Sequence, residues 1–95
     1  MKPNTLTPIS FEQLAPTSTT DGKTATVPAG CSAVLISVET TDARLTFTGV
    51  TPDSTHGHVF PKALGPVLVP VGQGATIEAV STAAAASAVN ITYLS

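Results

Sequence analysis

The stretch AVLISVE, residues 33–39, decides the fold class, because it is a nearly continuous apolar run that alternates as a strand does. Val34, Ile36 and Val38 fall on one face, and Ser37 and Glu39 fall on the other. Stiff β-branched side chains such as valine favour the pleated surface of a sheet. We therefore expect residues 33–39 to form a central strand.

The segment that follows also alternates. In ARLTFT, residues 43–48, the pattern places Leu45 and Phe47 inward and the remaining polar side chains outward. The polar residues 40–42 between the two segments are typical of a turn. The sequence predicts that these two strands form a hairpin.

Further short strands are predicted at 24–27, 58–60, 66–70, 75–81 and 88–94, with turns rich in glycine and proline between them. The prolines that bracket 66–70 suit an edge or corner position. Ala83–Ala86 is too short to nucleate a helix, so we interpret it as a tight connection. This spacing predicts an all-β chain with a single small antiparallel β-sandwich over residues 23–95.

Residues 1–22 differ from the rest and are predicted to form an extended N-terminal arm. Pro3, Pro8 and Pro16 remove backbone donors and favour extended geometry. The apolar residues of this segment, Ile9, Phe11 and Leu14, need cover, and where the segment docks on a partner we expect them to make that contact. Two alternatives remain open, since the segment either packs on its own domain as an edge strand or docks on a neighbouring subunit.

Length and composition exclude several classes of protein. Ninety-five residues leave no room for a second core, and 11% charged residues with a net charge of −2 give no electrostatic basis for binding nucleic acid or an anionic membrane. No apolar run approaches the roughly 20 residues of a membrane helix, and residues 1–7 do not resemble a secretory signal. A core this small without a disulfide favours self-association, so oligomerisation is expected.

The residues that could carry chemistry are few. His56 and His58 have the i, i+2 spacing of a two-histidine metal site, but beyond Asp53 no further ligand is evident, so we predict no metal. The lone Cys31 is interpreted as a small packed residue and not as a reactive thiol.

Catalytic motifs are also missing from the sequence. Neither a G-x-S-x-G motif nor a phosphate-binding glycine loop is present, and Gly72-Gln73-Gly74 is interpreted as a turn between strands. The acids Glu39, Asp42, Asp53 and Glu78 are expected to be solvated. We predict no enzymatic activity, no catalytic residue and no cofactor.

Three segments together resemble small structural proteins of tailed bacteriophages. They are the turn VPAG at 27–30 leading into the strand 33–40, the loop that runs from Thr51-Pro52 to His56-Gly57-His58 after Arg44-Leu45, and the ending VNITY at 89–93. The resemblance covers most of residues 22–95. Arg44 and His58 match recurring polar positions of that group, from which no ligand role carries over.

The resemblance implies a β-sandwich of jelly-roll type and a place on the virion. The function implied is that of a capsid cement, or decoration, protein, which is made in the host cytoplasm and binds the outer surface of the assembled head. Its partner would be the major capsid protein, whose neighbouring subunits it bridges, and it would self-associate as a trimer or dimer on the capsid.

Two alternatives belong to other classes. A small tail or head-fibre component could use the same sandwich to bind a receptor or carbohydrate, which calls for aromatic side chains beside acids in the loops. The loop 49–57 contains Asp53 and His56 but no aromatic residue. A small enzyme or metal protein would depend on His56 and His58.

Overall fold

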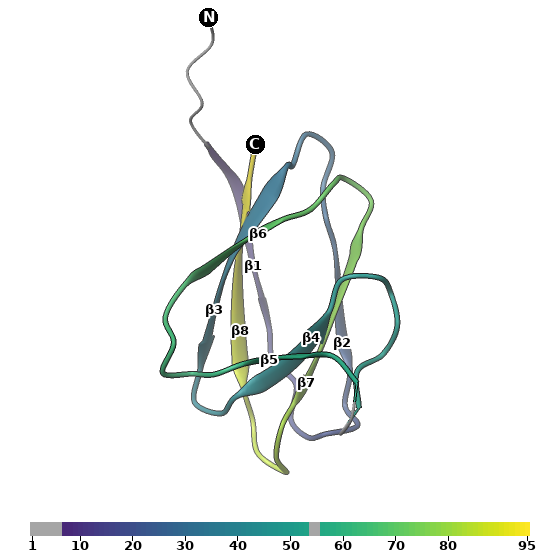
Figure 1. The fold of residues 1–95 in the computed structure, drawn as a ribbon, viewed down its shortest axis with the longest axis vertical. Helices are drawn as coiled ribbons and strands as arrows, with labels where there is room; N and C mark the ends of the chain where they lie inside the picture. Colours follow the sequence, from purple (N-terminus) through teal and green to yellow (C-terminus); the bar gives the residue numbers. More distant parts are fainter. Residues whose placement is uncertain (1–6, 54–55) are drawn as a thin grey trace, which may run out of the picture.

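The computed structural model describes residues 7–53 and 56–95, and these residues form two antiparallel four-stranded sheets packed face to face (Figure 1). The first sheet has the order β1 (Pro8–Leu14), β8 (Ala88–Leu94), β3 (Ala33–Glu39), β6 (Val67–Pro70). The second has the order β2 (Lys23–Thr26), β7 (Thr76–Ser81), β4 (Ala43–Thr46), β5 (His58–Phe60). The described residues contain no helix, so the predicted all-β sandwich is confirmed.

The core lies between the two sheets and is filled by the inward side chains that the alternation predicted. In β3, Val34 and Ile36 are fully buried while Leu35 between them is 37% exposed. From the opposite sheet, Leu45 and Ile77 are also fully buried. The central strands thus contribute alternate side chains to one apolar layer, as the period of two requires.

Most predicted strands are found close to their expected bounds. The segments 33–39, 58–60 and 88–94 are strands over the expected residues, and the other predicted strands differ by one or two residues at an end. β3 is central, between β8 and β6, and β6 is an edge strand, as its flanking prolines predicted. Residues 83–86 form an exposed connection without a helix.

The predicted hairpin of residues 33–39 and 43–48 is wrong. β3 pairs with β8 and β6, whereas β4 pairs with β7 and β5 in the other sheet. The connection crosses between the sheets through a γ-turn, in which Thr41 N donates to Glu39 O (2.9 Å) around Thr40, whose φ is 77°. The alternation of apolar and polar residues shows only that each strand has an inward face. It is the same whether the second strand pairs with the first in one sheet or packs against it from the opposite sheet.

A separate N-terminal arm is not confirmed. Pro8–Leu14 forms β1, an edge strand that pairs with β8 from Pro8 opposite Leu94 to Leu14 opposite Val89. Its register shifts between Pro8 and Ser10, and residues 1–6 of the expected arm lie outside the described residues. Of the two alternatives for this segment, the structure has the edge strand.

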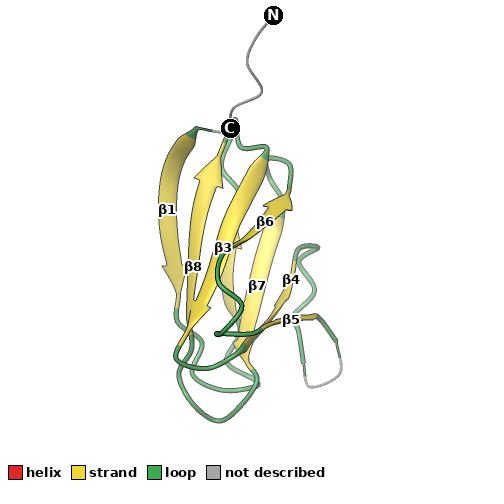
Figure 2. Ribbon diagram, turned by 60° about the vertical axis from the view of Figure 1, so that its left-hand side comes forward, coloured by secondary structure: helices red, strands yellow, loops and turns green. Residues whose placement is uncertain are grey.

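The two outer faces of the sandwich differ. Over β7 and β4, the chain after β1 and the chain after β4 approach closely, and Val80 and Pro52 are fully buried there. A Cβ atom on Gly22 would lie 3.3 Å from Thr51 Cγ2 and 3.9 Å from Val80 Cγ1. Figure 2 looks onto the other sheet and shows no loop over β1 or β8, whereas the chain between β5 and β6 passes in front of part of β3. The second sheet is therefore covered over β7 and β4 on its outer face, and the first is open over β1 and β8.

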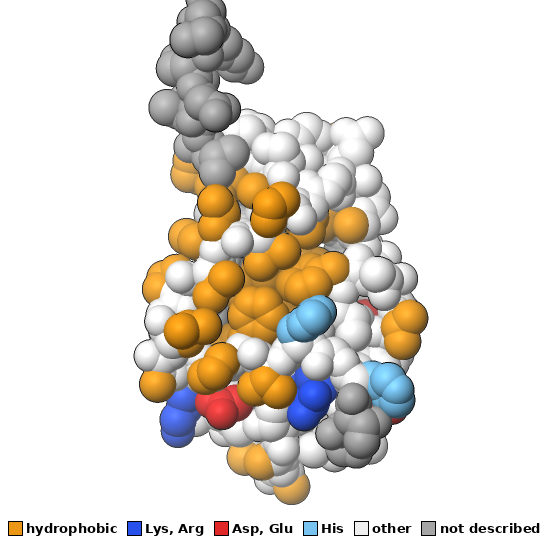
Figure 3. All heavy atoms as spheres, viewed as in Figure 1, with side chains coloured by type: hydrophobic (Ala, Val, Ile, Leu, Met, Phe, Trp, Pro, Cys, Tyr) orange, Lys and Arg blue, Asp and Glu red, His pale blue; other side chains and the backbone are white. Residues whose placement is uncertain are grey.

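The free edge of β6 lies on the side of the molecule where hydrophobic side chains gather around β6 and β5 (Figure 3), and it carries few hydrogen-bond donors. Val71 N donates to Ser32 O (3.2 Å), so by the alternation of an antiparallel pair the odd-numbered residues of β6 bond to β3. The N–H positions that face away belong to residues 66, 68 and 70, of which Pro66 and Pro70 have no N–H. Leu68 alone can donate from that edge.

We predict that adjacent residues of β3 differ sharply in their effect on stability. Ile36→Ala should lower the free energy of unfolding by about 2–5 kcal/mol, because the fully buried side chain leaves a cavity. Leu35→Ala, on the open face, should cost about 1 kcal/mol or less. Urea denaturation of both variants measures this, and equal losses would contradict the assignment of the two faces.

Candidate attachment surface

Across the open face of the first sheet, three apolar side chains and a threonine form a line perpendicular to the strands. Phe11 of β1 lies opposite Thr92 of β8, Thr92 lies opposite Leu35 of β3, and Leu35 lies opposite Leu68 of β6. Residues that are opposite one another in neighbouring strands share a face of the sheet. We call these four residues the apolar row: Phe11, Thr92, Leu35 and Leu68.

The three apolar residues of the row are exposed, and the outward positions of its four strands carry little charge. Phe11 is 63% exposed, Leu68 49% and Leu35 37%. The next row consists of Gln13, Asn90 and Ser37, and Gln13 Nε2 donates to Asn90 Oδ1 (2.7 Å). The only charged side chain at an outward position of these four strands is Glu39, at the end of β3. Exposed apolar side chains in a group, in contrast to scattered ones, mark interaction surfaces.

The three residues predicted to contact a partner do not lie together. Ile9 (43% exposed) sits at the register shift of β1 and Phe11 lies in the apolar row, so both are on the surface. Leu14 is buried in the protein's own core, with 6% of its surface exposed. Leu14 therefore stabilises the sandwich, and only Ile9 and Phe11 are accessible to a partner.

Leu35 and Leu68 are surface residues that sequence reasoning missed. The alternation of residues 33–39 left Leu35 on the outward face, which was a signal that could have been used. The position of Leu68 beside Leu35 had no such signal, because it depends on the register of β3 with β6.

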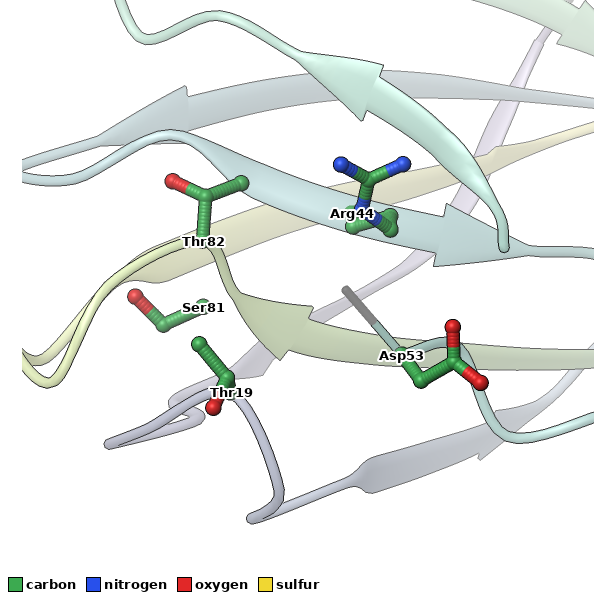
Figure 4. Close-up of a pocket in the computed structure, with 5 residues that line it drawn as sticks. All are labelled: Thr19, Arg44, Asp53, Ser81 and Thr82. Carbon is green, nitrogen blue, oxygen red and sulfur yellow. The ribbon is translucent and has the colours of Figure 1, made fainter. Parts of the chain in front are cut away.

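A second feature is a small pocket beside β4, lined by Thr19, Arg44, Asp53, Ser81 and Thr82 (Figure 4). Its polar groups bond mainly within the protein. Arg44 Nη1 donates to Gly57 O (3.2 Å), and Thr82 Oγ1 donates to Asp42 O (3.0 Å). Figure 4 shows the hydroxyl groups of Ser81 and Thr82 pointing away from Arg44. The side chains that line the pocket therefore hold neighbouring segments of the chain together. Their polar atoms do not converge on a single point.

The histidines are both exposed. His56 Nδ1 lies 2.9 Å from Asp53 Oδ1, and His58 lies opposite Leu45 in β5. In the described ranges 7–53 and 56–95, no three histidine, cysteine or acidic side chains are placed to hold a metal ion.

The acids are less uniformly solvated than expected. Glu39 and Asp53 are exposed, whereas Asp42 and Glu78 are half-buried. The carboxylate of Asp42 accepts a hydrogen bond from Lys62 N (2.8 Å). Asp42 thus connects the chain after β5 to the turn before β4.

Two polar contacts lie in or beside the core. Cys31 is buried, and its Sγ donates to Ala33 O (3.1 Å). Tyr93 OH donates to Glu12 Oε1 (2.8 Å), which connects β8 to the inner side of β1. Burial, followed by this bond to the carboxylate, raises the pKa of Tyr93 well above its ordinary value.

Comparison with known proteins found no matching family model, no matching curated protein and no matching solved structure. Over the described residues, the structure has no helix with the length and apolar character that a membrane span requires.

We predict that Gly57→Ala is more destabilising than Gly65→Ala. Both glycines have positive φ, 111° and 86°, so both variants strain the backbone by about 1–2 kcal/mol. At Gly57 the new Cβ would also lie 2.8 Å from Arg44 Cγ, 3.0 Å from Pro52 Cβ and 3.2 Å from Leu45 O, whereas at Gly65 nothing lies within 4 Å. Thermal unfolding of the two variants compares the crowded position with the open one, and similar melting temperatures would contradict the importance of the close packing around Gly57.

We predict that Tyr93 makes stability decline in alkaline solution. The folded protein holds the phenol proton more tightly than the unfolded chain, whose tyrosine has the ordinary pKa of 10.0. The contribution is therefore complete below pH 10 and is lost as the pH rises above it. Urea denaturation between about pH 8 and 11.5 should show a shallower decline for Tyr93→Phe than for the unaltered protein. Parallel curves would contradict this role.

Proposed function

We propose that this protein is a bacteriophage capsid cement protein that binds the outer surface of the assembled head and bridges neighbouring capsid subunits. The observation that carries the proposal is the apolar row, a line of uncharged and mostly exposed side chains on the more open of the two outer sheet faces. Covering such a face with another protein surface lowers the free energy, because apolar area is removed from water. Its partner in this proposal is the major capsid protein.

The strand order supports the jelly-roll form of the sandwich. Eight strands are divided between sheets of order β1-β8-β3-β6 and β2-β7-β4-β5. A jelly roll likewise has eight strands in two sheets and is common among viral capsid proteins. This likeness is one of architecture, and folds of this kind carry many functions. It agrees with the resemblance of the VPAG, TP-to-G and VNITY segments to phage structural proteins.

Cementing acts through linkage between binding and assembly. A protein that binds the assembled shell but not its separated subunits shifts the equilibrium toward the shell. Side-by-side copies that each cover two capsid subunits, as self-associated dimers or trimers on the virion surface, would add to this effect. The role requires no catalytic step from the residues of this chain.

The alternative, a receptor- or carbohydrate-binding component of a tail or head fibre, has less support. The aromatic rings of Phe47 and Phe60 contact each other, with centroids 6.2 Å apart, and both pack against the core. No aromatic residue occurs in the loop with Asp53 and His56.

The proposal predicts which exposed side chains are needed for attachment. Phe11→Ser and Leu35→Ser should each weaken binding to purified capsids about tenfold or more, because burying such a side chain is worth about 1.5–3 kcal/mol. Val50→Ser is the matched control, since Val50 is 59% exposed but lies outside the open face. The measurement is the number of copies bound per capsid as the protein is titrated onto capsids that lack it.

Two outcomes of this titration would contradict the proposal. Unchanged occupancy with Phe11→Ser and Leu35→Ser would show that the apolar row is not the contact. An equal loss with Val50→Ser would show that any exposed apolar residue has the same effect. Leu14 is unsuitable for this test, because its substitution would disturb the core.

A further inference from the structure

Strand β1 contributes little to the apolar core. Of its seven residues only Leu14 is buried, Glu12 is half-buried and the others are exposed. Its neighbour β8, by contrast, places Val89, Ile91 and Tyr93 in the core. A strand with so little buried apolar surface belongs to the part of a structure that opens at the lowest cost in free energy.

The contacts that do hold β1 are made mainly to β8. The two strands are paired through residues 8–14, Gln13 bonds to Asn90, and Tyr93 bonds to Glu12. Every one of these contacts would be equally available on the β8 of a second copy. Leu14, too, would fill the same space in another copy of the core.

The chain beyond β1 is fixed, which confines any opening to one residue. Pro16 is fully buried and its carbonyl accepts from Ser87 N (2.9 Å), while Ser18 O accepts from Ser81 N (3.1 Å). The exposed Ala15 alone lies between Leu14 and this anchored segment. Ala15 is therefore the residue at which the chain would change direction on exchange, within the extended region that a residue before a proline favours.

From these observations we propose that β1 exchanges between two copies of this protein, each β1 pairing with the β8 of the other. Exchange preserves each of these contacts, so its costs are the entropy of association and the change of backbone conformation at Ala15. Because the exchange is reciprocal, it produces a closed two-fold dimer and not a chain of molecules. High protein concentration favours it. This inference concerns the free protein and does not depend on attachment to a capsid.

A mixed disulfide between separate molecules tests the exchange. One preparation carries Gln13→Cys, the other carries Asn90→Cys, and both carry Cys31→Ala so that no other thiol is present. Gln13 and Asn90 lie opposite each other in β1 and β8, where antiparallel partners have Cα atoms about 4.5–5.5 Å apart, within the range of a disulfide. A tag on one protein gives the mixed dimer its own mass in a non-reducing gel.

Exchange predicts that the two proteins, mixed at high concentration and then oxidised, shift from monomer mass to that of the mixed dimer. The double variant Gln13→Cys/Asn90→Cys is the positive control. When it is dilute, its disulfide should close within one molecule, which shows that the two cysteines can bond and that the chain folds. A mixture of Gln13→Cys with Ser37→Cys is the control, since Ser37 lies one strand further away, about 10 Å from Gln13. The proposal is overturned if the mixed dimer is no more abundant than in this control.

Discussion

The burial of β8 and β3 at the centre of one sheet is the constraint on which the rest of the structure depends. Ile36 and Ile91 are opposite each other in these strands, and both are fully excluded from solvent. The chain has no disulfide and no tryptophan, so this aliphatic layer has no covalent support. Both β1 and β6 pair only with these two strands within their sheet. The apolar row exists because the same pair of strands aligns Thr92 with Leu35 on the reverse side.

The strands and their inward faces were predictable, because alternation is a local property. Val34, Ile36, Leu45 and Ile77 were assigned to the core from their spacing alone, and proline marked β6 as an edge. The pairing of strands was not predictable in the same way. A turn of three residues after β3 favoured a hairpin, whereas Thr40 with positive φ directs the chain into the other sheet.

The candidate surface shows the same division between local and non-local information. Ile9 and Phe11 were recognised as apolar residues in need of cover, and they are exposed. Leu14 was grouped with them because all three follow one another closely in the chain, yet the pleat turns Leu14 inward. The apolar row combines four strands whose positions in the sequence span residues 11–92, so only the register brings it together.

The free edges of the two sheets have a consequence for how this protein avoids aggregation. β6 offers a single donor between two prolines, β5 has three residues and β2 four, and the register of β1 shifts near its start. Short, interrupted and proline-bounded edges do not template the addition of further strands. Many proteins protect such edges with lysine and net charge, but only 11% of the residues here are charged. Protection of the sheet edges in this protein therefore rests on strand length, register and proline more than on electrostatic repulsion.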